Sequence, residues 1–176
     1  MGVLKKVVKK YPNGKIHEEY TTNECGDKFG EYKEFDMNGK CKTLYYYEDD
    51  VMKRHCIDFY ENGNKEYETI YYGTDISFRT FIHYYENGQI ETSTDMLDDD
   101  YHGKYLEYYE DGTLKEETHY RNYYKWDISK KWHSNGKLEL EEVYGSYEKL
   151  NGYRREWDYQ GKLVKEENYL DGRLVK

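Results

Sequence analysis

The stretch GKYLEYYEDGTLKEETHY, residues 103–120, contains one complete copy of the pattern that organises this chain. Two segments in which aromatic or aliphatic residues alternate with charged residues flank the dipeptide Asp111-Gly112. A dipeptide of Asn or Asp followed by Gly between alternating segments is a hairpin signal, because these residues tolerate a positive φ. The stretch therefore predicts two antiparallel strands joined by a tight turn.

The same turn recurs along the whole chain. Seven turn glycines follow one another at steps of 24 or 25 residues, and five of them follow an asparagine. They are Gly14, Gly39, Gly63, Gly88, Gly112, Gly136 and Gly161. A unit of this length holds two strands and two turns, so the spacing predicts about seven repeats and about 14 strands. We expect one continuous repeat domain over residues 1–176.

Positions counted from the turn glycine carry the same kind of side chain in successive repeats. Position −4 is aromatic in six of seven repeats, and we assign a structural role to these rings: Phe35, Phe59, Tyr84, Tyr108, Trp132 and Trp157. Positions +2 and +8 are mostly apolar or aromatic, whereas position +5 is glutamate in five repeats. Because strand side chains alternate between faces, we expect positions −4, +2 and +8 to share a buried face. The glutamates should face solvent.

A second turn is expected in each unit, nine residues before the next turn glycine. Glycine holds that place in three repeats and other residues hold it in three more: Gly30, Gly103 and Gly152, then Arg54, Arg79 and Asp127. No segment has a helical period that predicts an α-helix.

Composition separates this chain from a disordered one. Charged residues make up 36% and the mean hydropathy is -1.23, values that alone are typical of disorder. The 24 Tyr, 5 Phe and 3 Trp, however, lie at fixed repeat positions. We therefore expect a folded sheet with a thin core in which aromatic rings supply most of the buried area.

The three cysteines, Cys25, Cys41 and Cys56, lie at scattered spacings and are odd in number. This pattern predicts free thiols in a reducing compartment rather than a disulfide framework. The first residues contain no apolar run of a signal peptide, and no segment approaches the roughly 20 apolar residues that span a bilayer. We expect a cytoplasmic protein.

The unit resembles the MORN repeat, and more closely the bacterial variant found in YwqK-family antitoxin-like proteins. The resemblance covers nearly the whole chain and rests on the pattern G-x-Y-x-x-Y-Y-x-N-G-x-L-x-x-E-x-x-Y, seen at residues 103–120 and, as FYENG, at residues 59–63. It implies an all-β fold: an elongated, twisted or curved single-layer antiparallel array of β-hairpins without a second layer. Such families contain antitoxins, scaffolds and lipid-binding proteins, so the resemblance implies interaction and no single activity.

The sequence contains no constellation that predicts an enzyme, a cofactor or a metal site. The six histidines show no local ligand spacing, and the glycines occur singly rather than in a phosphate-binding loop. Two acidic runs, residues 48–50 and 98–100, carry oxygen ligands suited to a hard cation but lack the spacing of a known calcium loop. Acidic loop tips are the simpler interpretation of both runs.

A second aromatic set occupies position −3: Tyr11, Tyr60, Tyr85, Tyr109 and His133, with Asp36 and Asp158 in the other two repeats. Neighbouring strand residues face opposite sides, so positions −4 and −3 place a ring on each face. A single-layer sheet has no evident internal use for the second ring. We therefore predict that this stripe binds a partner, since tyrosine is enriched in binding hot spots. The alternative is that both faces need rings for sheet stability.

The net charge of -9 narrows the kinds of partner. It disfavours nucleic acid and anionic membrane headgroups and favours a basic protein. The sequence thus predicts a non-catalytic protein-protein interaction module, in its sharpest form an antitoxin or immunity protein that masks a basic toxin. The alternative is a scaffold or a peripheral protein that binds membranes or phosphoinositides through the basic residues near its two ends. The oligomeric state is left open.

Overall fold

A computed structural model of the chain describes residues 3–48, 51–72 and 77–175. Contacts divide the chain into two compact units, Met1–Gly88 and Gln89–Lys176. The division falls directly after a turn glycine, so no linker sequence separates the units. Each unit is described by itself.

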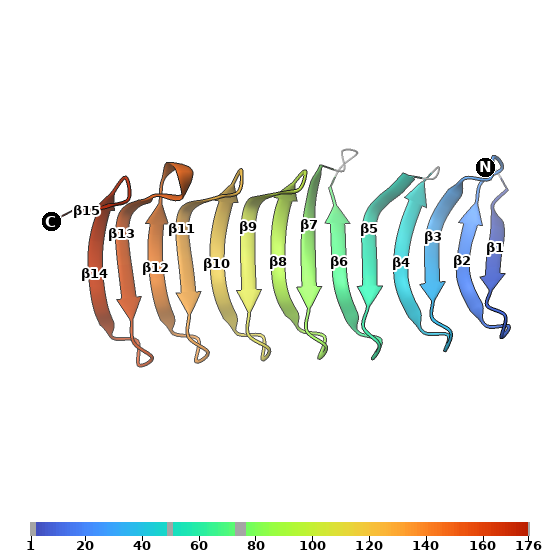
Figure 1. Ribbon diagram of the computed structural model, residues 1–176, viewed down its shortest axis with the longest axis horizontal. Coiled ribbons are helices and arrows are strands. Elements are labelled where there is room, and N and C mark those ends of the chain that lie inside the picture. The colour runs from blue at the N-terminus through green and yellow to red at the C-terminus, as the bar shows by residue number, and fades with distance from the viewer. Residues whose placement is uncertain (1–2, 49–50, 73–76, 176) are drawn as a thin grey trace. The chain divides into compact units, whose positions relative to one another are not determined.

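The first unit is an antiparallel sheet in which each strand pairs with the next one along the chain (Figure 1). Its strands are β1 (Lys5–Lys10), β2 (Ile16–Thr22), β3 (Lys28–Phe35), β4 (Cys41–Glu48), β5 (Val51–Phe59), β6 (Lys65–Tyr71) and β7 (Phe78–Tyr84). Every regular element described in this unit is a strand, so the unit is a single layer.

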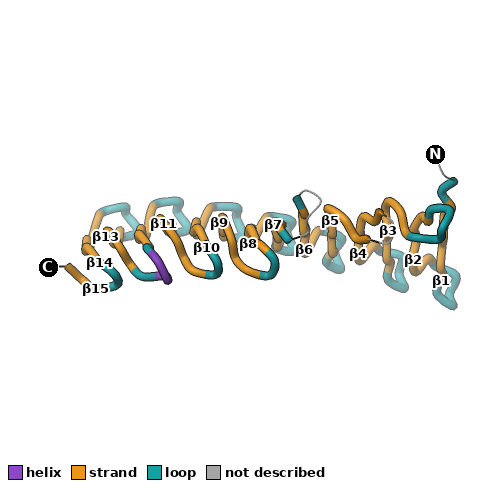
Figure 2. Tube along the Cα trace, turned by 90° about the horizontal axis from the view of Figure 1, so that it is seen from above, coloured by secondary structure: helices purple, strands orange, loops and turns teal. Residues whose placement is uncertain are grey.

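The second unit repeats this arrangement. Its strands are β8 (Ile90–Leu97), β9 (Asp100–Tyr108), β10 (Leu114–Arg121), β11 (Tyr124–Trp132), β12 (Leu138–Tyr144), β13 (Leu150–Trp157), β14 (Leu163–Leu170) and β15 (Arg173–Val175). One short 3-10 turn, η1 (Ser146–Glu148), lies between β12 and β13 and is purple in Figure 2. The predicted all-β hairpin array is confirmed, with fifteen strands among the described residues. None of these residues forms a helix of the length and apolarity needed to cross a membrane.

The turn glycines all adopt a positive φ, between 77° and 93°. In the first repeat the Tyr11 N–H donates to the Lys15 carbonyl and the Gly14 N–H donates to the Tyr11 carbonyl, both at 2.9 Å. This is a three-residue loop, a type I turn followed by a left-handed glycine. The preceding asparagines are not among the residues with positive φ. Asn-Gly therefore marks the hairpin correctly, but only its glycine uses the left-handed conformation.

The asparagine before the turn glycine contributes a side-chain hydrogen bond to the loop. In the repeats with Asn13, Asn62 and Asn135 its Oδ1 accepts the backbone N–H two residues further on, at 2.8–3.0 Å. In the two turns that have an aspartate at position −3, Asp36 and Asp158, one carboxylate oxygen accepts the N–H groups of the residues two and four positions further on. Both versions bond the loop N–H groups to a short side chain.

A bulge inverts the strand alternation after six of these turns, at Gly14, Gly39, Gly63, Gly112, Gly136 and Gly161. In the second hairpin Glu34 pairs with Thr43, but the next pair is Phe35 with Cys41, so the residue at position +3 is skipped. The same shift recurs in five other hairpins. Positions +4, +6 and +8 therefore share a face with −5 and −7. The prediction that +8 shares a face with −4 and +2 is wrong.

Nine of the twelve buried side chains in the described residues lie on this face, which we call the tyrosine face. They are Thr22, Tyr32, Thr43, Cys56, Thr94, Glu116, Thr118, Ser129 and Glu142. Rings on the same face contact one another, with centroids 5.5 Å apart for Tyr20 and Tyr32 and 6.2 Å apart for Tyr105 and Tyr120. Because no second layer covers the sheet, a side chain is buried only by longer neighbours beside it. Short hydroxyl residues such as Thr118 and Ser129 are therefore the most buried, and most rings, with the exception of Tyr32, stay partly exposed.

The opposite face carries the rings at position −4, which are all half-buried. It also contains an exception to the predicted solvent-facing glutamates. Glu68 is only 5% exposed, and it accepts hydrogen bonds from Lys65 at 2.7 Å and Tyr84 at 2.5 Å and contacts His55. These partners compensate for the loss of water around a buried carboxylate.

The glycines expected at a second turn lie inside strands instead. Gly103 belongs to β9 and Gly152 to β13, with φ of 108° and 137°. They mark bulges, and the second turns lie earlier, for example at Asp98-Asp99 between β8 and β9. A Cβ on Gly103 would lie 2.9 Å from the Asp95 Cβ, so the position requires glycine for both conformation and space.

We expect Gly103→Ala to destabilise the second unit more than Gly136→Ala. Both positions have positive φ, which costs a residue with a Cβ about 1–2 kcal/mol, but the nearest side-chain atom to a Cβ at Gly136 is 3.9 Å away. Overpacking against Asp95 adds about 1–3 kcal/mol to the Gly103 variant alone. Urea denaturation of the full chain measures both changes. Equal losses for the two variants would contradict the proposed steric contact.

Candidate interaction surface

Four of the residues predicted to form a partner-binding stripe link their own repeat to the following one. Tyr11, Tyr60 and Tyr109 donate their hydroxyls, and His133 donates its Nε2–H, to the carbonyl of the residue at position −4 of the following repeat. The acceptors are Phe35 at 2.8 Å, Tyr84 at 2.6 Å, Trp132 at 2.8 Å and Trp157 at 3.0 Å, respectively. Tyr85, at the same repeat position, is half-buried.

These carbonyls lie just past the end of the strand pairing. The pairing of β10 with β11 ends at Glu116 and Lys131, and Trp132 lies one residue further along β11. The Tyr109 hydroxyl supplies the donor that the neighbouring strand no longer provides. The expectation that the sheet has no internal use for this stripe is therefore wrong, since a half-buried carbonyl without a donor is costly. Partner binding by the stripe stays a prediction.

Side chains of the turns continue the same linkage. The Nδ2 groups of Asn13, Asn62 and Asn135 donate to a carbonyl of the next turn, at 3.3, 2.7 and 2.7 Å. The ammonium groups of Lys15 and Lys137 donate to next-turn carbonyls at 2.9 and 2.6 Å. Many polar groups of the glycine turns are thus used to link consecutive repeats.

A buried charged cluster lies on the tyrosine face of the second unit. Glu116 is 9% exposed and contacts the ammonium groups of Lys131 at 3.1 Å and Lys125 at 3.6 Å. Thr118, which is fully buried, donates its hydroxyl to Glu116 at 2.9 Å and lies 2.6 Å from the Ser129 hydroxyl. Burial alone would raise the pKa of Glu116, but the ammonium and hydroxyl groups outweigh it and lower the pKa below its ordinary value. The Glu116 carboxylate is thus stabilised by groups of the sheet itself.

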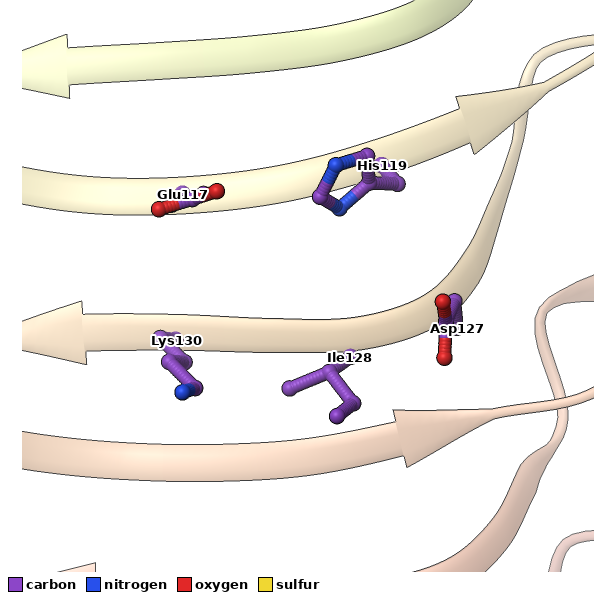
Figure 3. A pocket seen from close by; sticks show the side chains of 5 residues that line it. All are labelled: Glu117, His119, Asp127, Ile128 and Lys130. Atoms are coloured by element: carbon purple, nitrogen blue, oxygen red, sulfur yellow. The ribbon is translucent and has the colours of Figure 1, made fainter.

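A small pocket opens between β10 and β11 on the other face. Figure 3 shows its lining, Glu117 and His119 from β10 and Asp127, Ile128 and Lys130 from β11. Glu117 pairs with Lys104 at 2.9 Å and Lys130 pairs with Glu141 at 3.3 Å. The buried Nδ1 of His119 has no hydrogen-bond partner in the described structure. Two of the three charged side chains that line the pocket, Glu117 and Lys130, are therefore already engaged in ion pairs.

The other polar candidates also lack a site. No group of three His, Cys, Asp or Glu among the described residues could hold a metal ion. Of the two acidic runs, Asp49 and Asp50 lie outside the described residues, and Asp98 and Asp99 form the β8–β9 turn. The three cysteines are free, and burial raises the pKa of Cys56 to about 11.

An exposed aromatic patch lies where the β10–β11 hairpin meets the loop after β12. We call Arg121, Tyr123, Tyr124, Trp126 and Tyr147 the aromatic patch. Its four rings are 58%, 46%, 40% and 74% exposed, in that order. η1, which carries Tyr147, packs against β11, so two loops separated by some twenty residues supply one surface.

Two tyrosines of the patch have an unfavourable backbone conformation. Tyr123 has φ 71° and Tyr147 has φ 58°. Asn122 and Tyr123 form a two-residue hairpin loop between the paired residues Arg121 and Tyr124, which normally takes glycine at its second position. The hairpin between β14 and β15 has that preferred residue, as Asp171-Gly172. Tyr123 therefore keeps a strain that glycine would remove.

The patch rings are held in defined contacts. Tyr124 and Tyr147 meet edge-on, with centroids 5.7 Å apart at 77°, and the Arg121 guanidinium lies 5.4 Å from the Trp126 ring centre. The Tyr123 N–H donates to the Tyr101 carbonyl at 3.2 Å, which ties this loop to β9. A hollow of about 320 Å³ separates the two loops and is lined by Arg121, Asn122, Tyr124, Trp126, Ser146 and Tyr147.

Sequence reasoning missed this patch because it followed the residues that repeat. The patch could have been found from the residues that depart from the repeat. The run Tyr123-Tyr124-Lys125-Trp126 has no counterpart in the other units, and Asp127 stands where three repeats have glycine. Asp127 nevertheless adopts φ 64°, like those glycines, so the bulge next to Trp126 is retained.

The family model of the MORN repeat variant matches residues 80–94 and 101–122. The matched stretches contain two of the turn glycines, and the same turn geometry recurs at the glycines outside them. The match supports a MORN-repeat protein, and MORN repeats generally serve as modules that interact with proteins or membranes. No curated protein matches the chain.

Tyr109→Phe removes the hydroxyl that donates to the Trp132 carbonyl and keeps the ring. We expect it to lower the free energy of unfolding by about 1 kcal/mol, because the Trp132 carbonyl loses its hydrogen bond. Tyr159→Phe is the control, since its hydroxyl makes only an exposed 3.4 Å contact with Ser134, and it should change stability by less than about 0.5 kcal/mol. Denaturant titration separates the two. No loss in the Tyr109 variant would show that the link between repeats is energetically unimportant.

Acid should weaken the second unit through Glu116. Its pKa is lowered from 4.5 in the folded state, so its stabilising contribution is complete above pH 4.5 and is lost as the pH falls through the folded pKa. We expect Glu116→Gln to cost about 1–3 kcal/mol at pH 7, with the difference from wild type narrowing below pH 4.5. Glu166→Gln, in an exposed pair with Arg155, should cost less than about 1 kcal/mol. Unfolding measured from pH 3 to 7 checks this, and a pH-independent difference would contradict it.

Proposed function

We propose that this protein is a non-catalytic protein-protein interaction module that binds its partner through the aromatic patch. The observation that carries the proposal is the pair of exposed tyrosines, Tyr123 and Tyr147, held at positive φ. Such strain persists where the surrounding structure and the role of the residue require it. Glycine at either position would relax the backbone but remove a contact ring.

The composition of the patch supports the same proposal. Tyr, Trp and Arg are the residue types most enriched in binding hot spots, because they offer large contact areas at modest entropic cost. The rings are positioned by a short hairpin loop and by η1 rather than by a long mobile segment. A partner would therefore meet a largely preformed surface, which lowers the cost of ordering on binding.

The finer proposal is an antitoxin or immunity role in the bacterial cytoplasm, with a basic toxin as partner. The support is the match to the MORN repeat variant and the net charge of -9. A negative surface accelerates encounter with a basic protein and makes binding sensitive to salt. Co-expression with a toxin encoded in a neighbouring gene tests this role directly.

The alternative is a scaffold or a peripheral protein that binds anionic membranes, as other MORN repeats do. The basic strand β1 is its best support. However, Lys6 and Lys9 pair with Glu19 at 3.0 Å and Glu18 at 2.8 Å, which reduces the charge that β1 offers to lipid headgroups. Flotation with anionic vesicles would favour this alternative if the chain moved with the lipid.

Patch variants test the leading proposal. We expect tagged wild-type protein to retain a specific protein from a lysate of the source cells, and the charge-neutral Tyr124→Ser/Tyr147→Ser variant to retain at least tenfold less. Tyr159→Ser, at an exposed tyrosine outside the patch, should behave as wild type. Tyr123→Gly should lose binding while gaining about 1 kcal/mol of stability, because the strain at φ 71° is removed. Equal capture by all four proteins would exclude the patch.

A further inference from the structure

We propose that the aromatic patch recognises an arginine side chain in a segment of its protein partner. This inference rests on the proposed function and adds the chemistry of the ligand. The hollow of about 320 Å³ between the two loops is bordered by the rings of Tyr124, Trp126 and Tyr147. A hollow of this size accepts one long side chain and is too small for a helix or a strand.

The patch already holds a guanidinium group. Arg121 lies 5.4 Å from the Trp126 ring centre, within the range of a cation–π interaction. Tyr124 and Tyr147 meet edge-on rather than face to face, so each ring keeps a π face that its neighbour does not cover. A planar guanidinium stacks on such faces better than an ammonium, because it is delocalised and weakly hydrated.

Carboxylates surround the patch. Interaction with the Asp100 carboxylate raises the pKa of Tyr123, and the charge of Asp99 adds to this effect. Glu148 follows Tyr147 directly in η1, and its charge reaches the neighbouring strands: burial raises the pKa of Tyr120 to about 12, with Glu116 and Glu148 contributing. The second unit as a whole carries 20 acidic and 14 basic residues. This charge favours a cationic guest over a neutral or an anionic one.

The test uses the full chain and short capped peptides of sequence Ala-X-Ala-X-Ala, in which X is arginine, lysine, citrulline or proline. Citrulline keeps the shape of arginine and removes its charge. Binding is followed by NMR, through the Trp126 indole N–H and the backbone amides of the two loops. We expect the arginine peptide to shift these signals at least fivefold more strongly than the lysine peptide, and the citrulline peptide to leave them unchanged.

The Tyr124→Ser/Tyr147→Ser variant distinguishes stacking from general attraction to an acidic protein, since it leaves the net charge unchanged. Its affinity for the arginine peptide should fall at least fivefold, and that of Tyr159→Ser should not change. The comparison of arginine with citrulline needs no variant, so it remains valid if the double variant is unstable.

Equal binding of the arginine and citrulline peptides, or equal affinity of wild type and the double variant, would overturn the arginine proposal. Binding of the proline peptide at the patch in place of the arginine peptide would overturn it too, while leaving the patch as a protein-binding surface. Patch-dependent capture of a protein without any response to the arginine peptide likewise refutes this inference alone. If the patch neither affects the capture of a protein nor responds to the arginine peptide, the proposed function is refuted as well.

Discussion

The absence of a second layer governs the structure of each unit. A residue of these sheets is shielded from water only by its neighbours on the same face, so burial depends on the height of the side chain relative to those beside it. Thr118 is fully buried between longer side chains, whereas most rings are half-exposed. Large side chains therefore serve as cover and small hydroxyl residues as the covered core, the reverse of the distribution in a two-layer domain. Polar residues suit this core because each neighbour can supply a hydrogen bond.

The turns at the two ends of the strands differ in what they do. At the end of the strands where the glycine turns lie, side chains such as Tyr109 and Asn135 donate hydrogen bonds to backbone carbonyls of the next repeat. This linkage adds a nearest-neighbour interaction to strand pairing, as repeat arrays require. At the opposite end of the strands the turns differ in length and conformation, and the strained residues Tyr123 and Tyr147 of the second unit lie there. One repeat is thus compatible with a regular end of the strands, which stabilises the array, and with a variable end, where we propose that recognition takes place.

Much of the fold could be predicted from the sequence because the repeat spacing carries it. The hairpins, the left-handed turn glycines and the all-β class follow from Gly112 and its equivalents. The face on which each side chain lies could not be predicted, because one skipped residue at position +3 reverses the alternation in six hairpins, as Phe35 and Thr43 illustrate. The aromatic residues of the candidate stripe can be read from the sequence, but the hydrogen bonds of their hydroxyls depend on carbonyls 23 or 24 residues away.

The sequence by itself determined where the chain turns, how often it turns, and that strands rather than helices lie between the turns, since these properties depend on local φ preferences and short-range alternation. Only the tertiary structure decided which face is buried and which tyrosines are engaged, because bulges and lateral contacts between repeats set both. It also brought Tyr124 and Tyr147 together across two loops. That contact depends on the packing of η1 against β11, an interaction between segments that no local pattern encodes.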